Sequence, residues 1–223
     1  MAKVPAKESL SITGPAGELE ALVECPASFD GRRVAVLCHP HPQYQGTMLN
    51  KVVHTLARAM TDVGVLALRF NFRGTGASEG EYGGGIGEVD DLTCVVAYVR
   101  HRWPDAELWL AGFSFGAVVS VRAAISLKAA RLISIAPAVN ILGRELAAIP
   151  AMPWLIIQGD ADDVVPADDV IEWVGKLDPQ PELIVLPGAG HFFHGQLVAL
   201  RGLLVEWLAE NGINIESYKK AKE

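Results

Sequence analysis

The sequence contains little cysteine. Only Cys25, Cys38 and Cys94 occur among 223 residues, and their positions follow no paired spacing. Disulfide-stapled domains use cysteines in dense, even-numbered sets, so this sparse and odd set argues against that class of fold. We therefore expect reduced thiols in a cytoplasmic protein that is stabilised by a packed core.

Positive charge and long apolar runs are also scarce. The chain has 19 Lys and Arg against 26 Asp and Glu, a formal net charge of −7, and no basic cluster stands out. Nucleic-acid surfaces need such a cluster. No stretch reaches the roughly 20 apolar residues that cross a bilayer, and the opening "MAKVPAKESLSITG" lacks the apolar run of a signal peptide. We expect no nucleic-acid partner and no membrane partner.

Hydrophobic residues, in contrast, make up 50% of the chain. A protein of this length and composition can bury roughly 70% or more of its surface, enough for a core without staples. We find no internal repeat and no Pro/Ser linker. The sequence therefore predicts one domain over residues 1–223, as a monomer or a small homo-oligomer.

Short apolar runs alternate with helical patterns along the chain. Such runs are typical of strands buried on both faces of a parallel sheet. Period-2 alternation around Gly14–Gly17 predicts an antiparallel hairpin before them. We predict an α/β fold with a mostly parallel, doubly wound sheet of about eight strands and an N-terminal antiparallel hairpin. The apolar runs cover 34–38, 65–70, 108–112, 132–136, 154–159 and 182–188, and the clearest helical patterns cover 48–60, 88–103 and 197–210.

The run at 108–112 leads into the pentapeptide Gly112-Phe113-Ser114-Phe115-Gly116, and a helical pattern follows at once. A G-x-S-x-G motif between a strand and a helix is the signature of a nucleophile elbow. The glycines are needed because Cβ atoms at those positions would collide with neighbouring backbone in so tight a turn. Isolated matches to the motif arise by chance, but this context favours a functional Ser114.

A serine nucleophile needs a histidine base, and the last predicted strand ends near one. His191 follows Gly188 and Gly190, which free the loop to curl, and His194 is the alternative, already near the last helix. We predict that His191 is the base.

The base in turn needs a carboxylate that fixes its tautomer. Asp160, Asp162 and Asp163 all follow the run at 154–159 and compete for this role, whereas Asp168 and Asp169 come after Pro166 and suit the first turn of a helix. The resulting chain order of serine, aspartate and histidine is that of α/β-hydrolases.

Five segments make the resemblance specific: "CHPHPQYQGTM", "FRGTGASEG", "GFSFG", "QGDADDVVP" and "GAGHFF" occur in family order. The chain resembles the α/β-hydrolase superfamily, close to its small dienelactone-hydrolase-like and esterase-like members. The family loop Gly-x-x-Asp-x-x-Val-Pro, matched on Gly159, Val165 and Pro166, implies that the acid is Asp162. Dienelactone hydrolases proper use a cysteine nucleophile where this chain has Ser114, so dienelactone is not the expected substrate.

The resemblance also implies an oxyanion hole of two backbone N–H groups. One belongs to the residue after the nucleophile, Phe115, and the other to the loop that follows 34–38. Pro40 and Pro42 in that loop have no N–H. His41 is therefore the expected donor, with Gln43 as the second choice.

The same loop could be interpreted as part of a metal site, because Cys38, His39 and His41 are close in sequence. Cys38 and His39 are adjacent at the end of a predicted strand, however, and would point to opposite faces. No second ligand cluster follows at zinc-site spacing. We expect no metal and no cofactor.

Only residues 137–153 separate two predicted strands at the position where related enzymes carry lids, which leaves room for one short helix and no cap domain. We therefore expect an open site and a small-molecule substrate, and we predict a serine hydrolase of short-chain carboxylic esters that forms an acyl-enzyme. A thioesterase or small-peptide hydrolase would use the same triad, and a non-catalytic ligand-binding protein is the alternative of another class. The candidate apolar walls are Tyr44, Phe113, Val139, Leu142, Val164 and Phe192.

Overall fold

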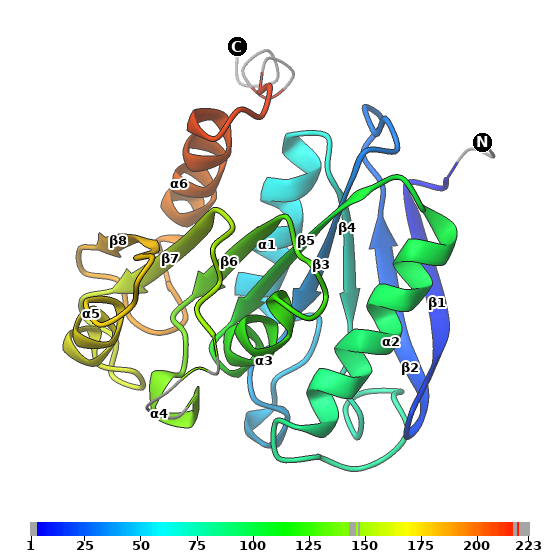
Figure 1. Ribbon diagram of the computed structural model, residues 1–223, viewed down its shortest axis with the longest axis horizontal. Coiled ribbons are helices and arrows are strands. Elements are labelled where there is room, and N and C mark those ends of the chain that lie inside the picture. The colour runs from blue at the N-terminus through cyan, green and yellow to red at the C-terminus, as the bar shows by residue number, and fades with distance from the viewer. Residues whose placement is uncertain (1–3, 143–145, 147, 216–217, 219–223) are drawn as a thin grey trace.

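The computed structural model describes residues 4–142, 146, 148–215 and 218. Their strands form one eight-stranded sheet in the order β1-β2-β4-β3-β5-β6-β7-β8 (Figure 1). The strands are β1 (Lys7–Gly14), β2 (Gly17–Glu24), β3 (Arg33–Cys38), β4 (Leu66–Phe70), β5 (Glu107–Phe113), β6 (Arg131–Ile135), β7 (Trp154–Gly159) and β8 (Glu182–Leu186).

The predicted fold class is confirmed. β1 and β2 form the antiparallel hairpin, and β2 pairs antiparallel with β4. The other neighbouring pairs are parallel, from β4–β3 to β7–β8. Each parallel strand was predicted from a run of apolar residues, and β3 to β7 are indeed buried along almost their whole length.

Helices cover both faces of the sheet, so the protein has two apolar cores. α1 and α6 pack together on one face, and α2 and α3 pack on the other (Figure 1). β5 contributes to both, because alternate side chains of a strand point to opposite faces: Leu110 lies in the α2/α3 core, and Phe113 lies in the α1/α6 core. The helices are α1 (Lys51–Asp62), α2 (Gly87–Arg102), α3 (Phe115–Ala124), α4 (Val139–Leu142), α5 (Ala167–Val174) and α6 (Leu197–Glu210), and a 3-10 turn, η1, covers Pro42–Tyr44.

Between β6 and β7, the described residues contain one short helix, α4, as the length of this segment predicted. In the described parts of the chain, no helix combines the length and apolar character that crossing a membrane requires. Because the parallel strands point the same way, β3, β5, β7 and β8 all end at one edge of the sheet. Polar side chains that follow these strands meet there, as ligand-binding residues do in open α/β sheets.

Candidate active site

Ser114 stands on a strained turn between β5 and α3. Its backbone angles are φ 55° and ψ −116°, a region that non-glycine residues rarely occupy. A Cβ atom at Gly112 would lie 2.3 Å from the backbone of Gly116, and one at Gly116 would lie 2.3 Å from the carbonyl oxygen of Cys38. Both positions therefore require glycine, as the motif predicted.

The turn presents Ser114 at the beginning of a helix. Ser114 is the N-cap of α3, and its own N–H donates to the carbonyl of Ile135 on β6 at 2.9 Å. The first N–H groups of a helix have no partner within it and carry a partial positive charge. Phe115 is the first residue of this helix, and its N–H therefore stays the predicted oxyanion donor on this side.

His191 connects this serine to a carboxylate. Its Nε2 lies 3.1 Å from Ser114 Oγ, and its Nδ1 lies 2.8 Å from Asp162 Oδ2. The imidazole is almost fully buried, and its ring packs 5.0 Å from the ring of Phe113 and 5.2 Å from that of Phe192. The structure thus brings together the serine, histidine and aspartate that the sequence suggested, with both ring nitrogens in hydrogen-bond range.

Asp162 accepts four hydrogen bonds. Oδ2 accepts from His191 and from Gln158 Nε2 at 3.0 Å, and Oδ1 accepts from the N–H groups of Val164 at 2.9 Å and Val165 at 2.7 Å. Burial on its own would raise the pKa of Asp162, but the bonds from His191 and from the two backbone N–H groups outweigh it and hold the pKa below its usual value. The carboxylate is therefore ionised at neutral pH despite its burial.

The alternative candidates for the acid and the base do not contact Ser114 or each other in this way. Asp160 Oδ1 accepts from the N–H of Gly188 at 2.6 Å, which ties the loop after β7 to the end of β8. Asp163 is exposed. His194 is exposed and stacks on the ring of Phe192 at 5.8 Å. Asp162 and His191 are thus the members of these sets that the structure places against Ser114.

The loop with two histidines and two prolines packs beside the nucleophile. The ring of His41 lies 4.9 Å from the ring of Phe115. His41 Nδ1 accepts the N–H of Gln43 at 3.2 Å, so the neutral ring carries its proton on Nε2, which lies 3.2 Å from Tyr82 Oη. Partial burial lowers the pKa of His41, against the opposing effect of Glu88. Because the N–H of Gln43 is already bonded, the N–H of His41 stays the predicted oxyanion donor.

Two substitutions at His41 separate the backbone N–H from the imidazole. We expect His41→Ala to lower kcat less than about tenfold, because it keeps the N–H, and His41→Pro to lower it about 10²- to 10³-fold, because it removes one oxyanion donor. The φ of His41 is −53°, close to the value that proline imposes. Steady-state kinetics with and without EDTA measure both effects. An inactive but folded His41→Ala enzyme, or inhibition of the wild type by EDTA, would instead support a metal role for the ring.

The ring of His39 connects two loops of the fold. It is fully buried at the end of β3, where Nδ1 donates to the carbonyl of Pro40 at 2.6 Å and Nε2 accepts the N–H of Phe72 at 3.0 Å. Burial lowers the pKa of His39 from 6.5 to about 4. Neutral His39 therefore ties the loop after β3 to the loop after β4, and both ring nitrogens are committed to protein partners. The neighbouring Cys38 is buried too, which raises the pKa of its thiol to about 12.

This environment predicts a loss of stability in acid. Between pH 6.5 and about pH 4, the unfolded chain takes up a proton at His39 that the folded chain does not. The free energy of unfolding should therefore decrease as the pH is lowered through this window, and His39 alone should account for about 3 kcal/mol of the loss. Urea denaturation at pH 7 and pH 4.5 measures the loss. His39→Gln does not titrate and should lose less over the same range, whereas an equal loss in both proteins would contradict the assignment.

The predicted apolar walls divide into two groups. Tyr44, Val164 and Phe192 are exposed, 81%, 54% and 43% respectively, and each lies within three residues of His41, Asp162 or His191. Val139 is partly buried at the start of α4. Phe113 differs from expectation, because it is fully buried beneath His191 and leaves no side-chain surface for a substrate. Leu142 ends α4, and its side chain lies outside the described residues.

Two polar side chains of this region were not predicted. Tyr82 reaches His41 from the glycine-rich loop before α2, where no motif marks it. Gln158 contacts Asp162 from within β7. The sequence did contain a signal for Gln158, since it is the one polar side chain in the otherwise apolar run "WLIIQG".

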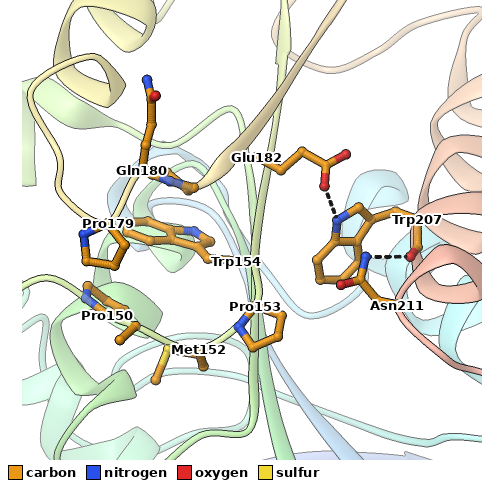
Figure 2. Close-up of a pocket in the computed structure, with 11 residues that line it drawn as sticks. Pro150, Met152, Pro153, Trp154, Pro179, Gln180, Glu182, Trp207 and Asn211 are labelled. Carbon is orange, nitrogen blue, oxygen red and sulfur yellow. Dashed lines mark hydrogen bonds between the residues drawn. The ribbon is translucent and has the colours of Figure 1, made fainter.

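Two cavities lie at the opposite edge of the sheet. One, of about 350 Å³, is bordered by the starts of β7 and β8 and by the end of α6, and Figure 2 shows Trp154 beside Pro179 and the indole of Trp207 bonded to Glu182. The other, of about 690 Å³, lies near the start of β3 and the end of α2. Neither lining includes Ser114, Asp162 or His191, so neither cavity is part of the candidate active site.

Comparisons with known proteins identify relatives of this chain. A family model described as "Serine aminopeptidase, S33" matches residues 47–149. An alpha-beta serine hydrolase homologue from Coxiella burnetii is 46% identical and has a TM-score of 0.87, and the match covers 92% of this chain and 99% of that chain. An α/β serine hydrolase without lid from Xanthomonas campestris is 42% identical, also with a TM-score of 0.87, over 93% of this chain and 96% of that chain.

A protein of Rickettsia prowazekii (strain Madrid E), named Uncharacterized protein RP471, is 36% identical in an alignment 191 residues long that covers 81% of this chain and 79% of the relative. The matches to these three proteins each extend over most of the chain. The chain therefore belongs to the α/β-hydrolase superfamily, with lidless α/β serine hydrolases among its relatives.

Proposed function

We propose that this hydrolase cleaves small carboxylic esters with short acyl chains through a Ser114–His191–Asp162 triad. The observation that carries the proposal is the continuous contact from Ser114 Oγ to His191 Nε2 at 3.1 Å and from His191 Nδ1 to Asp162 Oδ2 at 2.8 Å. A serine on a strained elbow with a histidine and a buried carboxylate in this order is the arrangement that acyl transfer requires.

The reaction proceeds in two halves. Ser114 Oγ attacks the ester carbonyl carbon while its proton passes to His191 Nε2, and Asp162 stabilises the imidazolium. The N–H groups of Phe115 and His41 bind the oxyanion. The carbon–oxygen bond to the alcohol then breaks, and the leaving alkoxide takes the proton from His191. Water attacks the acyl-enzyme with the same proton transfers, which releases the acid and restores Ser114.

The exposed apolar side chains near the triad support an uncharged acyl or alkyl group in the substrate. Tyr44, Val164 and Phe192 offer such contacts beside His41, Asp162 and His191 respectively. The chain has only three cysteines, and they follow no paired spacing, which supports action in the cytoplasm. The chemistry of the triad needs no cofactor.

A second candidate is hydrolysis of small peptides. The description of the matching family model, which names a serine aminopeptidase, favours it. Peptides, thioesters and esters all pass through the same acyl-enzyme, so the triad by itself does not separate them.

A substrate panel tests the choice. We expect kcat/KM for p-nitrophenyl acetate and butyrate to exceed that for an aminoacyl p-nitroanilide by about 100-fold or more, since both the exposed apolar contacts and the easier leaving group favour the esters. An acyl thioester and a p-nitrophenyl octanoate complete the panel. Faster cleavage of the anilide would favour the peptidase, and faster cleavage of the thioester would favour a thioesterase.

A further inference from the structure

Gln158 is a buried amide next to the triad. It is fully buried in β7, after four apolar residues of the same strand. Burying a polar side chain is costly unless its hydrogen-bonding groups find partners. The contacts of Gln158 therefore indicate why this position is not apolar like its neighbours.

The NH₂ group of Gln158 points at acceptors. Nε2 lies 3.0 Å from Asp162 Oδ2, 2.9 Å from the carbonyl oxygen of Val165 and 3.3 Å from that of Gly159. All three partners are acceptors, so the reversed amide would place its oxygen against three oxygens. Oε1 is buried and has no hydrogen-bond partner within the described residues. The side chain thus acts here as a donor.

The bond to Asp162 falls on the oxygen that faces His191. Gln158 and His191 both donate to Oδ2, while two backbone N–H groups donate to Oδ1. A carboxylate oxygen has two lone-pair positions. With one position of Oδ2 occupied by Gln158, the other is left for His191. The hydrogen bond that Gln158 donates to Asp162 Oδ2 also makes this oxygen attract the proton on His191 Nδ1 less strongly.

We propose that Gln158 is a positioning residue of the triad, which orients Asp162 Oδ2 toward His191 and keeps the transferable proton on the imidazole. This inference rests on the proposed function. A role in folding alone is the competing explanation, because the bond to the Val165 carbonyl also ties the loop after β7 to its strand.

The first test is Gln158→Met, which keeps the length of the side chain and removes the donor. We expect kcat to fall roughly 10- to 100-fold, the range for one lost hydrogen bond to a charged group, while KM changes less than about twofold. The acidic limb of the rate profile should move to higher pH, because an unshared Oδ2 stabilises the imidazolium more strongly. A loss of kcat with an unmoved limb would overturn the proposal.

The second variant, Gln158→Glu, should change the shape of the profile. The introduced carboxyl group can still donate to Asp162 while it is protonated, so the variant should follow the wild-type profile until this group ionises. At higher pH the two neighbouring carboxyl groups would both be ionised at close range, and activity should then fall where that of the wild type stays high. A profile parallel to that of the wild type would contradict a bond between this side chain and Asp162.

A matched control and a substrate-free readout complete the design. Ser134 is buried on the adjacent strand β6 and accepts from Trp154 Nε1 at 3.0 Å, so Ser134→Ala should lower the melting temperature without moving the acidic limb. The downfield proton resonance of His191 Nδ1–H should shift in Gln158→Met and not in Ser134→Ala. This resonance is observed without substrate, so it tests Gln158 even if the enzyme does not cleave esters. An unshifted resonance, or failure of both Gln158 variants to fold, would leave a structural role and overturn the proposal.

Discussion

Replacing Ser114 with alanine is expected to lower ester hydrolysis by roughly 10⁴- to 10⁶-fold, because the only nucleophile on the elbow is lost while the fold is kept. Alanine fits the site sterically, since the strain of the elbow lies in the backbone and in the glycines on either side. Initial rates with p-nitrophenyl butyrate measure the loss. The unfolding midpoint of the variant should stay close to that of the wild type.

Covalent labelling makes this prediction sharper. A fluorophosphonate should add one phosphonyl group to the wild type by intact mass and none to Ser114→Ala. Ser120→Ala is a matched control, since Ser120 is buried in the same helix and its hydroxyl donates to the carbonyl of Ala111. Labelling that persists in Ser114→Ala, or is lost in Ser120→Ala, would contradict the assignment of Ser114 as the nucleophile.

The parts of the fold that were predictable are those with a local pattern. β7 begins and ends where the apolar run "WLIIQG" does, and α6 has the predicted bounds 197–210. The elbow was predictable because its geometry demands glycine on both sides of Ser114, and these glycines are visible in the sequence. Buried strands and tight turns impose residue types at fixed positions, so sequence reports them directly.

The choice of Asp162 over its neighbours had a different basis. Composition and spacing left Asp160, Asp162 and Asp163 equivalent, and only the resemblance to the family loop distinguished them. The structure supplies the physical difference: the N–H groups of Val164 and Val165 point at Asp162, and the N–H of Gly188 points at Asp160. Such contacts depend on how two loops meet, which no local pattern encodes.

Contacts between distant segments account for part of what was missed. Tyr82 contacts His41 and His39 contacts Phe72 across more than 30 residues of sequence, whereas Gln158 contacts Asp162 only four residues further on. Phe113 was expected to line the site, but the alternation of side chains along β5 directs it into the α1/α6 core.

Replacing Asp162 with asparagine should lower kcat by about 10⁴-fold, the size of loss known for a neutralised triad acid. The hydrogen bonds of this site explain why so small a change is so damaging. The backbone N–H groups of Val164 and Val165 donate to Oδ1 and would hold the amide oxygen of asparagine there. The amide NH₂ would then replace Oδ2 and face the donors of Gln158 and His191.

Faced with an NH₂ group, His191 would keep a hydrogen bond only by moving its own proton from Nδ1 to Nε2, which leaves Nε2 unable to accept the proton of Ser114. Asp162→Asn should therefore reduce the rate of fluorophosphonate labelling along with kcat, because both need the base. Asp160→Asn and Asp163→Asn are the matched controls, and each should keep kcat within about tenfold of the wild type. If either control lost as much activity as Asp162→Asn, the carboxylate that serves His191 would have to be reassigned.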